Sequence, residues 1–234
     1  MVVIFSVEGN IGSGKSTLVK YLSKNMRSWF PNNSIIFLQE PVDEWNTIMD
    51  ENGITILENF YKDQEKYAFS FQMMAYISRL SLLKKTIRSN PNSIIICERS
   101  MWTDKEVFAK MLFNDNKIDC INYTIYNKWF DEFVKDVPLT GIIYVKTNPR
   151  VCQERIKIRG REGETIPLEY SVKCHNYHEE WFAKSSVDII ELDGDVDFKE
   201  NIPDRWKGII YNVISSNAPP QTDLYMNWND MGYY

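Results

Sequence analysis

The sequence predicts an α/β fold in which a five-stranded parallel sheet has helices on both faces. Apolar β-rich segments recur along the chain, helical stretches alternate with them, and a glycine-rich loop follows the first segment. The expected strands are residues 2–7, 35–38, 93–97, 141–145 and 187–192. Alternating strands and helices are typical of parallel sheets, because each helix returns the chain to the edge where the next strand starts.

Seven helices are expected between and after these strands. Several begin with proline or an acidic residue, which favour the first turn of a helix. The expected helices are residues 15–27, 64–89, 104–114, 121–136, 149–159, 167–185 and 204–215. Residues 1–215 are therefore expected to form a single domain. Residues 216–234 contain Pro219 and Pro220 and show neither period, so we expect a C-terminal tail.

Composition excludes several classes of protein. The 234 residues, 44% of them apolar, suffice for one sizeable core. The apolar stretches are far shorter than the roughly 20 residues that cross a bilayer, and no targeting segment is apparent, so we expect an intracellular, cytoplasmic protein with no membrane partner. A net charge of −5 disfavours a polynucleotide partner. The four widely spaced cysteines, Cys97, Cys120, Cys152 and Cys174, are expected to be reduced, buried thiols.

The strongest motif is a Walker A phosphate-binding loop that lies between the first expected strand and helix. Its glycines allow backbone N–H groups to surround phosphates at a helix N-terminus. Lys15 is expected to span the β- and γ-phosphates, and Ser16 to bind Mg²⁺. The expected phosphate site of ATP comprises Gly9, Asn10, Ile11, Gly12, Ser13, Gly14, Lys15, Ser16 and Thr17.

Glu40 follows the second expected strand and is a candidate catalytic base. Parallel α/β sheets bind ligands at the carboxyl ends of their strands. An alcohol acceptor must lose a proton as it attacks, whereas a monophosphate acceptor is already charged and needs positive groups to hold it. Glu40 therefore indicates an alcohol acceptor. The alternative is that Glu40 only caps a turn before Pro41.

Glu98 and Arg99 follow the third expected strand. Glu98 is expected to hold Mg²⁺, with water between them or directly, and Arg99 to neutralise the transferring phosphoryl group. A solvated surface pair is the alternative, although the apolar run before Glu98 directs both residues to the sheet edge.

Three arginines, Arg155, Arg159 and Arg161, lie around the end of an expected helix near Gly160 and Gly163. A cationic lid of this kind would exclude water and stabilise charge on the γ-phosphoryl oxygens. A solvated basic helix face is the alternative interpretation.

Together these residues resemble the deoxynucleoside kinases, a family that includes deoxycytidine, deoxyguanosine and mitochondrial thymidine kinases. The resemblance covers nearly the whole chain and is carried by residues 9–17, 40–45, 61, 69–72, 78–79, 98–100, 104, 155–161 and 166–170. It implies a P-loop kinase fold with a mobile arginine lid. It also implies ATP-dependent phosphorylation of the 5′-hydroxyl of a deoxynucleoside in nucleotide salvage, with Glu40 as the base, Arg99 assisting it and Lys15 on the phosphates.

The resemblance further implies an acceptor pocket that the residues alone do not assemble. Tyr61 and Glu169 would hold the sugar 3′-hydroxyl, and Gln72 would bind the edge of the base. Phe108 would stack on the base, while Trp45 and Phe71 would line the pocket. Asp197 and Phe198 are expected, on weaker grounds, near the adenine of the donor. For each aromatic residue, core packing is the alternative.

Arg79 and Asp104 are expected to select the base. Cytosine and purine enzymes of the family carry an Arg–Asp pair at these positions, whereas thymidine-accepting members carry smaller or apolar residues. A charged pair facing the 5-position of the base would crowd a thymine methyl group. We therefore predict deoxycytidine or a purine deoxynucleoside over thymidine.

Two other functions fit these residues less well. A nucleoside monophosphate kinase of the thymidylate type shares the expected fold, but Gln39 stands where such enzymes place an arginine. A catalytically silent binding subunit is disfavoured because Lys15, Ser16, Glu40 and Arg99 are all retained. The resemblance also implies a homodimer joined through helices and feedback inhibition by a deoxynucleoside triphosphate.

Overall fold

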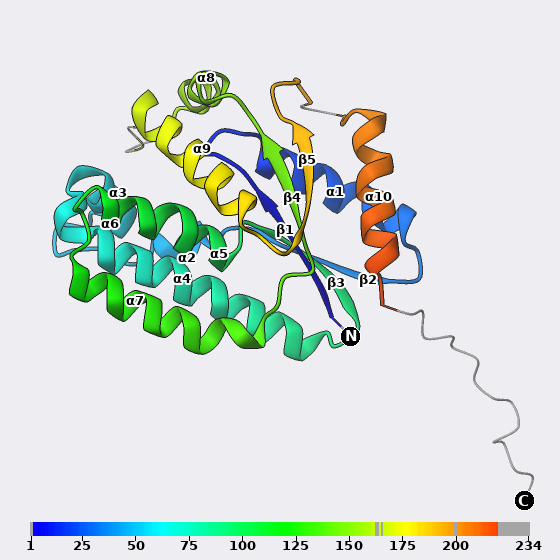
Figure 1. The fold of residues 1–234 in the computed structure, drawn as a ribbon, viewed down its shortest axis with the longest axis horizontal. Coiled ribbons are helices and arrows are strands. Elements are labelled where there is room, and N and C mark those ends of the chain that lie inside the picture. The colour runs from blue at the N-terminus through cyan, green and yellow to red at the C-terminus, as the bar shows by residue number, and fades with distance from the viewer. Residues whose placement is uncertain (1, 162–163, 165, 199–200, 220–234) are drawn as a thin grey trace, which may run out of the picture.

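The computed structural model describes residues 2–161, 164, 166–198 and 201–219, which form a parallel sheet between two layers of helices (Figure 1). The strands are β1 (Val3–Glu8), β2 (Ser34–Leu38), β3 (Ser93–Glu98), β4 (Gly141–Lys146) and β5 (Asp188–Asp193). They pair in the order β2-β3-β1-β4-β5, and every pairing is parallel. The predicted α/β fold class is confirmed.

Each helix expected from the sequence has a counterpart. The helices are α1 (Lys15–Trp29), α2 (Val42–Trp45), α3 (Ile56–Lys62), α4 (Gln64–Ser89), α5 (Met101–Thr103), α6 (Lys110–Asn114), α7 (Cys120–Phe133), α8 (Pro149–Arg159), α9 (Leu168–Ala183) and α10 (Asp204–Asn217), with a π-helix η1 (Asp104–Ala109) and a 3-10 helix η2 (Val134–Asp136). The short helices α2 and α3 were not predicted. A capping box between Thr55 and Glu58 starts α3, and that Thr-x-x-Glu spacing was readable in the sequence. Helix α10 continues to Asn217, and residues 220–234 of the expected tail lie outside the described residues.

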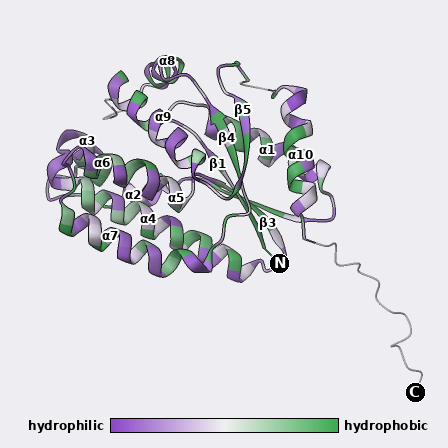
Figure 2. Ribbon diagram, in the orientation of Figure 1, coloured by the Kyte–Doolittle hydropathy of each residue, from purple (hydrophilic) through white to green (hydrophobic). Residues whose placement is uncertain are grey.

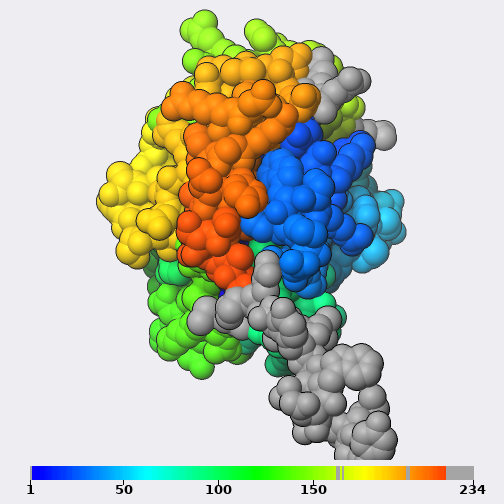
Figure 3. Space-filling view, turned by 90° about the vertical axis from the view of Figure 1, so that its right-hand side faces the viewer, coloured from blue at the N-terminus to red at the C-terminus, as the bar shows by residue number. Residues whose placement is uncertain are grey.

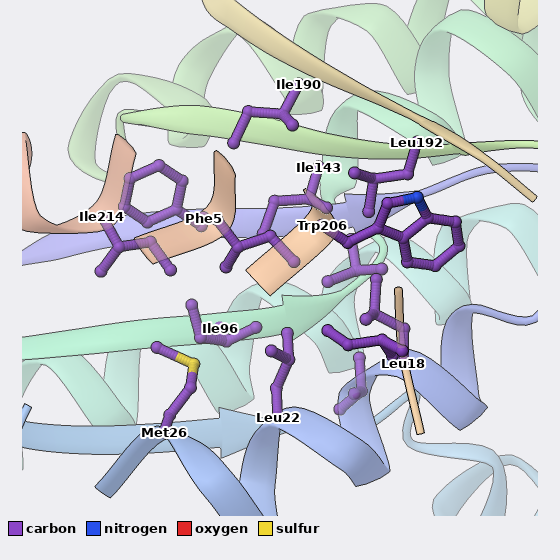
Figure 4. Close-up of a cluster of buried hydrophobic side chains, with 14 of the residues drawn as sticks. Phe5, Leu18, Leu22, Met26, Ile96, Ile143, Ile190, Leu192, Trp206 and Ile214 are labelled. Carbon is purple, nitrogen blue, oxygen red and sulfur yellow. The ribbon is translucent and has the colours of Figure 1, made fainter. Parts of the chain in front are cut away.

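One face of the sheet packs against α1 and α10. Side chains alternate along a strand, so Val3, Phe5 and Val7 of β1 point to this face (Figure 4). Leu22 of α1 and Trp206 of α10 meet them from the helices. Figure 3 shows α10 lying beside α1 on this side of the molecule. The inner strands β1, β3 and β4 are buried along nearly all of their length, as expected for strands covered on both faces, whereas Asp188, Glu191 and Asp193 of the edge strand β5 are exposed. The helices show both hydrophobic and hydrophilic positions (Figure 2).

The opposite face packs against α4, α7 and α9. Ile4 of β1 and Ile95 of β3 contact a cluster that includes Tyr76 of α4 and Phe130 of α7. Over β4, a second cluster includes residues of α9 and η1, with Trp181 among its members. Residues of α4, α9 and η1 in this layer also line the cavity described below.

The strand order determines where the site lies. Strands β2, β3 and β1 are neighbours, and their paired residues include Leu38 with Cys97 and Val7 with Glu98. The residues that follow them, beginning at Gln39, Arg99 and Gly9, therefore leave the sheet at one common edge. This arrangement brings the phosphate loop and two acidic segments together.

None of the described helices combines the length and apolar character that a bilayer crossing requires. All four cysteines are free thiols. Cys97, Cys152 and Cys174 are buried as predicted, but the prediction was wrong for Cys120, which is exposed. Cys120 is the first residue of α7, and the first turn of a surface helix projects into solvent.

Close packing at Gly141 predicts that it tolerates no side chain. A Cβ there would lie 2.5 Å from the Cε1 atom of Phe5, which is fully buried. We expect Gly141→Ala to lower the free energy of unfolding by about 1–3 kcal/mol in urea titrations. Gly208→Ala is the matched control: no atom lies within 4 Å of its Cβ position in α10, so alanine should raise the free energy of unfolding by about 0.5–1 kcal/mol. Unchanged stability of Gly141→Ala would mean that Phe5 can move.

Candidate active site

A cavity of about 400 Å³ opens at the edge where β1, β2 and β3 end. It brings together most of the residues predicted to act. The predicted residues that line it are Ile11, Gly12, Gly14, Lys15, Ser16, Thr17, Glu40, Trp45, Tyr61, Phe71, Gln72, Glu98, Arg99, Asp104, Phe108, Arg155, Arg159, Arg161, Asp197 and Phe198. Its lining also includes apolar residues that the sequence analysis did not single out, among them Val42, Leu57 and Phe60.

The phosphate loop has the conformation that its glycines permit. Gly9, Gly12 and Gly14 have positive φ angles of 144°, 78° and 102°. A Cβ on Gly12 would lie 2.6 Å from the carbonyl oxygen of Cys152 in α8, so the loop also packs tightly against that helix. The backbone is thereby free to surround a phosphate at the N-terminus of α1.

Three predicted loop residues, Gly9, Asn10 and Ser13, lie behind the cavity lining. Their carbonyl oxygens accept hydrogen bonds from the side chains of Arg99, Lys15 and Arg155 at 2.9, 2.6 and 3.2 Å, respectively. Through these carbonyl oxygens the three residues anchor the positively charged side chains of the site.

Lys15 is buried at the base of the loop. Burial, reinforced by the positive charge of Arg99, lowers the pKa of its ammonium group to about 7. An anionic phosphate would favour the charged form of Lys15. The position therefore suits a group that acquires its full charge when phosphate binds.

Ser16 and Glu98 form a pair of oxygen donors beside the loop. Ser16 Oγ donates a hydrogen bond of 2.6 Å to Glu98 Oε1. Hard oxygen atoms are the ligands that Mg²⁺ prefers, and it commonly keeps several waters, so two protein ligands fit this ion. No cluster of three or more His, Cys, Asp or Glu side chains suited to a metal occurs among the described residues.

Glu40 lies between two arginines at the mouth of the acceptor side. Its Oε1 atom is 3.0 Å from Arg79 Nη2 and 3.5 Å from Arg99 Nε. Burial opposes its negative charge, but Arg79, Arg99 and Lys15 outweigh that effect and hold the pKa of Glu40 below its usual range. The carboxylate is therefore ionised at neutral pH and able to accept a proton.

Arg79 and Asp104 form the expected ion pair, with both side chains buried. Arg79 Nε is 3.0 Å from Asp104 Oδ2, and Arg79 Nη1 donates to the carbonyl oxygen of Glu98 at 3.0 Å. Burial disfavours the charge on Arg79, but Asp104 and Glu40 outweigh it, so the pKa of the guanidinium is raised. Arg79 thus connects the two carboxylates, a link that the sequence did not reveal.

The π-helix η1 lies directly at the site. It begins at Asp104 and contains Phe108, and both residues line the cavity. The Arg99 guanidinium lies 5.0 Å from the centre of the Phe108 ring. Wide helical turns of this kind change which side chains share a face, and they occur frequently at functional sites.

The part of the cavity expected to bind the acceptor is lined by aromatic residues. It contains one amide oxygen that has no hydrogen-bond partner among the described residues. Phe71 stacks on Phe60 at 4.6 Å and meets the edge of Trp45 at 5.5 Å. Trp45 Nε1 donates to Ser78 Oγ at 2.9 Å. Gln72 is buried and its Oε1 atom accepts no hydrogen bond from the described residues. A buried acceptor of this kind needs a partner, which a ligand can supply.

The structure places Glu164, rather than Glu169, beside Tyr61. Glu169 is exposed on the first turn of α9 and does not contribute to the cavity lining. The Glu164 side chain is 4% exposed, lines the cavity and forms an ion pair with Arg159. Burial, with a contribution from the negative charge of Glu164, raises the pKa of Tyr61. The predicted Glu169 therefore lies outside the cavity, and Glu164 is the carboxylate that lies near Tyr61.

Arg155 is not oriented like a lid residue. Besides the carbonyl of Ser13, its guanidinium donates to those of Gly194 and Val196 at 2.8 and 3.2 Å. It connects the phosphate loop to the segment that carries Asp197 and Phe198. A Cβ on Gly14 would lie 2.6 Å from Phe198, whose ring also packs edge-on against Trp206 at 4.8 Å.

Comparison with known proteins agrees with this geometry. Residues 5–214 match the family model described as deoxynucleoside kinase. A protein of fowlpox virus named as a probable deoxycytidine kinase is 35% identical over 217 residues, which cover 89% of this chain and 85% of that protein. Human deoxycytidine kinase is 32% identical over 233 residues (89% and 88%). The mitochondrial deoxyguanosine kinase of Xenopus laevis is 31% identical over 203 residues (79% and 74%).

The family match extends from β1 into α10 and so includes the phosphate loop, the carboxylate after β2 and the wall of the acceptor pocket. A monophosphate kinase or a silent binding subunit is not favoured. This chain belongs to the deoxynucleoside kinase family, and it is an ATP-dependent phosphotransferase that acts on a hydroxyl group.

Proposed function

We propose that the enzyme transfers the γ-phosphate of ATP to the 5′-hydroxyl of deoxycytidine or a purine deoxynucleoside in nucleotide salvage. The observation that carries this proposal is the position of Glu40, an ionised carboxylate between the phosphate loop and the aromatic pocket. In this position it would remove the proton from a hydroxyl group directed at the γ-phosphate. We also retain the expectation of a cytoplasmic enzyme.

Positive groups would stabilise the transferring phosphoryl group. Lys15 and Arg99 lie on the phosphate side of Glu40, and Arg159 and Arg161 line the cavity from the end of α8. We propose that Arg159, the last residue of α8, and Arg161, which follows the helix, close over the phosphates as a mobile lid, with Gly160 as a hinge. Arg155 would position the loop beneath them. Asp197 and Phe198 would flank the donor base.

Ser16 and Glu98 would hold Mg²⁺, directly or through water. When bound, the ion would neutralise charge on the β- and γ-phosphate oxygens. The hydrogen bond between Ser16 and Glu98 holds both oxygen atoms close together.

The acceptor would be recognised at its sugar and its base. Tyr61 and Glu164 are suited to hold the 3′-hydroxyl, and Gln72 offers its free carbonyl oxygen to an amino group on the base edge. The Arg79–Asp104 pair would crowd a 5-methyl group and so disfavour thymidine. The names of the relatives, deoxycytidine and deoxyguanosine kinases, support the same preference.

The enzyme is also proposed to be a homodimer through α4 and α7. Ile77 of α4 and Ile121, Ile125 and Trp129 of α7 are 51%, 69%, 39% and 50% exposed. The three α7 residues follow one another at intervals of four and so share a helix face. An exposed apolar stripe of this kind suits a second copy of the chain.

Feedback inhibition by a deoxynucleoside triphosphate that enters both the donor and acceptor sides is a further proposal.

The role of Glu40 can be tested by Glu40→Gln. The amide cannot accept the proton of the hydroxyl group, so kcat for deoxycytidine with Mg-ATP should fall by about 10²–10⁴-fold. Deoxycytidine binding, measured by calorimetry, should change only a few-fold. Glu44→Gln makes the same chemical change at an exposed site in α2 and should leave kcat unchanged. Unaltered turnover in Glu40→Gln would eliminate Glu40 as the base.

The selectivity proposal predicts that removing both partners of the buried pair admits thymidine. In Arg79→Met with Asp104→Ala, the ratio of kcat/KM for thymidine to that for deoxycytidine should increase about 10–100-fold. Because Arg79 also stabilises the ionised form of Glu40, the acid limb of the deoxycytidine pH profile should move to higher pH. An unchanged ratio would contradict the assignment.

The dimer proposal predicts that Trp129→Glu produces monomers in analytical ultracentrifugation, because a charge would be buried at the contact. Tyr211→Glu, on the exposed side of α10, is the control and should leave the assembly intact. A wild-type protein that is monomeric at micromolar concentration would refute the proposal.

A further inference from the structure

Arg99 has a backbone conformation that non-glycine residues rarely adopt. Its φ angle is +63°, in the left-handed region that is sterically unfavourable for a residue with a side chain. Such residues persist at functional sites only when the surrounding structure holds them. The contacts that hold the turn after β3 therefore decide whether the guanidinium reaches Glu40.

The carboxyl end of β1 provides several of these contacts. Arg99 N donates to the carbonyl oxygen of Val7 at 3.0 Å, and Arg99 Nη1 donates to that of Gly9 at 2.9 Å. The residue between these two acceptors is Glu8, which is fully buried. Its side chain belongs to neither the phosphate site nor the cavity lining.

Glu8 is connected to the turn through Thr103. Thr103 Oγ1 donates a hydrogen bond to Glu8 Oε2, and the same oxygen accepts a long contact of 3.5 Å from the amide of Ser100, the residue after Arg99. Thr103 N in turn donates to the carbonyl oxygen of Ser100 at 3.1 Å. The Thr103 hydroxyl thus connects β1 to the residue that immediately follows the strained one.

We propose that Glu8 and Thr103 are positioning residues that hold Arg99 in its left-handed conformation and so direct its guanidinium to the reacting phosphoryl group. The proposal rests on the role given above to Arg99. Neither residue touches the substrate, and both act through the turn.

Burial favours the neutral carboxylic acid form of Glu8 in this role. Its carboxyl group is fully buried beside the hydroxyls of Ser6, Ser100 and Thr103, and burial disfavours the charged form of a carboxyl group. Burial raises the pKa of Glu8, although the Ser100 and Thr103 hydroxyls and the Arg99 charge partly oppose the shift. Another titratable group close to it is the buried thiol of Cys97 on β3. Thr103 can donate to the carbonyl oxygen of the neutral acid.

The first test is Thr103→Val, which removes the hydroxyl while keeping the shape. With Mg-ATP and deoxycytidine, kcat should fall at least tenfold while both KM values change less than threefold. The preference for deoxycytidine over thymidine should be unchanged, because Asp104 is not the residue affected. Thr103→Ser should restore kcat to within threefold of the wild type. Thr140→Val removes a hydroxyl that accepts from Ile4 N at the opposite end of β1, and it should have no effect on kcat.

A double-mutant cycle separates this proposal from the role of Arg99. Arg99→Ala alone should lower kcat, and adding Thr103→Val should cause no further loss. If Arg99→Ala retains wild-type kcat, the proposed function of Arg99 fails. If Arg99→Ala is impaired but Thr103→Val has wild-type kcat, or if the two losses multiply, the positioning role is overturned.

Glu8 variants test the neutral acid. Glu8→Ala should lose kcat as Thr103→Val does, whereas Glu8→Gln should retain it, since an amide oxygen also accepts from Thr103. A raised folded pKa makes the stability contributed by Glu8 complete below pH 4.5 and progressively lost at higher pH. The Tm of Glu8→Gln relative to the wild type should therefore increase from pH 5 to pH 8. A difference independent of pH, or a Glu8→Gln enzyme as impaired as Glu8→Ala, would overturn the assignment.

Discussion

The carboxylate of Glu40 is held between two guanidinium groups, and the rest of the site is organised around this contact. Arg79 reaches it from α4, and Arg99 reaches it from the end of β3. Each arginine has a second anchor, Asp104 for Arg79 and the carbonyl of Gly9 for Arg99. The contact therefore links the buried Arg79–Asp104 pair to the phosphate loop in one network of charges.

Because this network is buried, its charges interact strongly, and each charge needs a partner. Three charged side chains, Arg79, Arg99 and Asp104, are almost completely removed from solvent. Removing one partner would leave an uncompensated buried charge, whereas removing a matched pair would not. The strained turn at Arg99 fits the same pattern, because a local backbone cost is maintained only where surrounding contacts over-determine the geometry.

Several site features followed from the sequence and others did not. The Walker A spacing identified Lys15 and Ser16 because phosphate binding needs those residue types in a fixed local order. Glu40 and Arg99 were identified because each follows an apolar strand. Glu164 was not singled out because its proximity to Tyr61 joins two segments that lie far apart in the sequence. The sequence showed only a run of basic residues on a helix. It did not reveal that Arg155 donates hydrogen bonds to carbonyls in two distant segments.

By itself, the sequence determined the alternation of strands and helices, the phosphate loop and the family, since these depend on local periodicity and fixed spacing. Only the tertiary structure decided which side chains meet across the cavity. It joined Arg79 to Glu40, placed Glu8 against Thr103, and put Glu169 on the surface. These contacts join residues tens of positions apart, and they exist because the strand order β2-β3-β1 brings three chain ends to one edge.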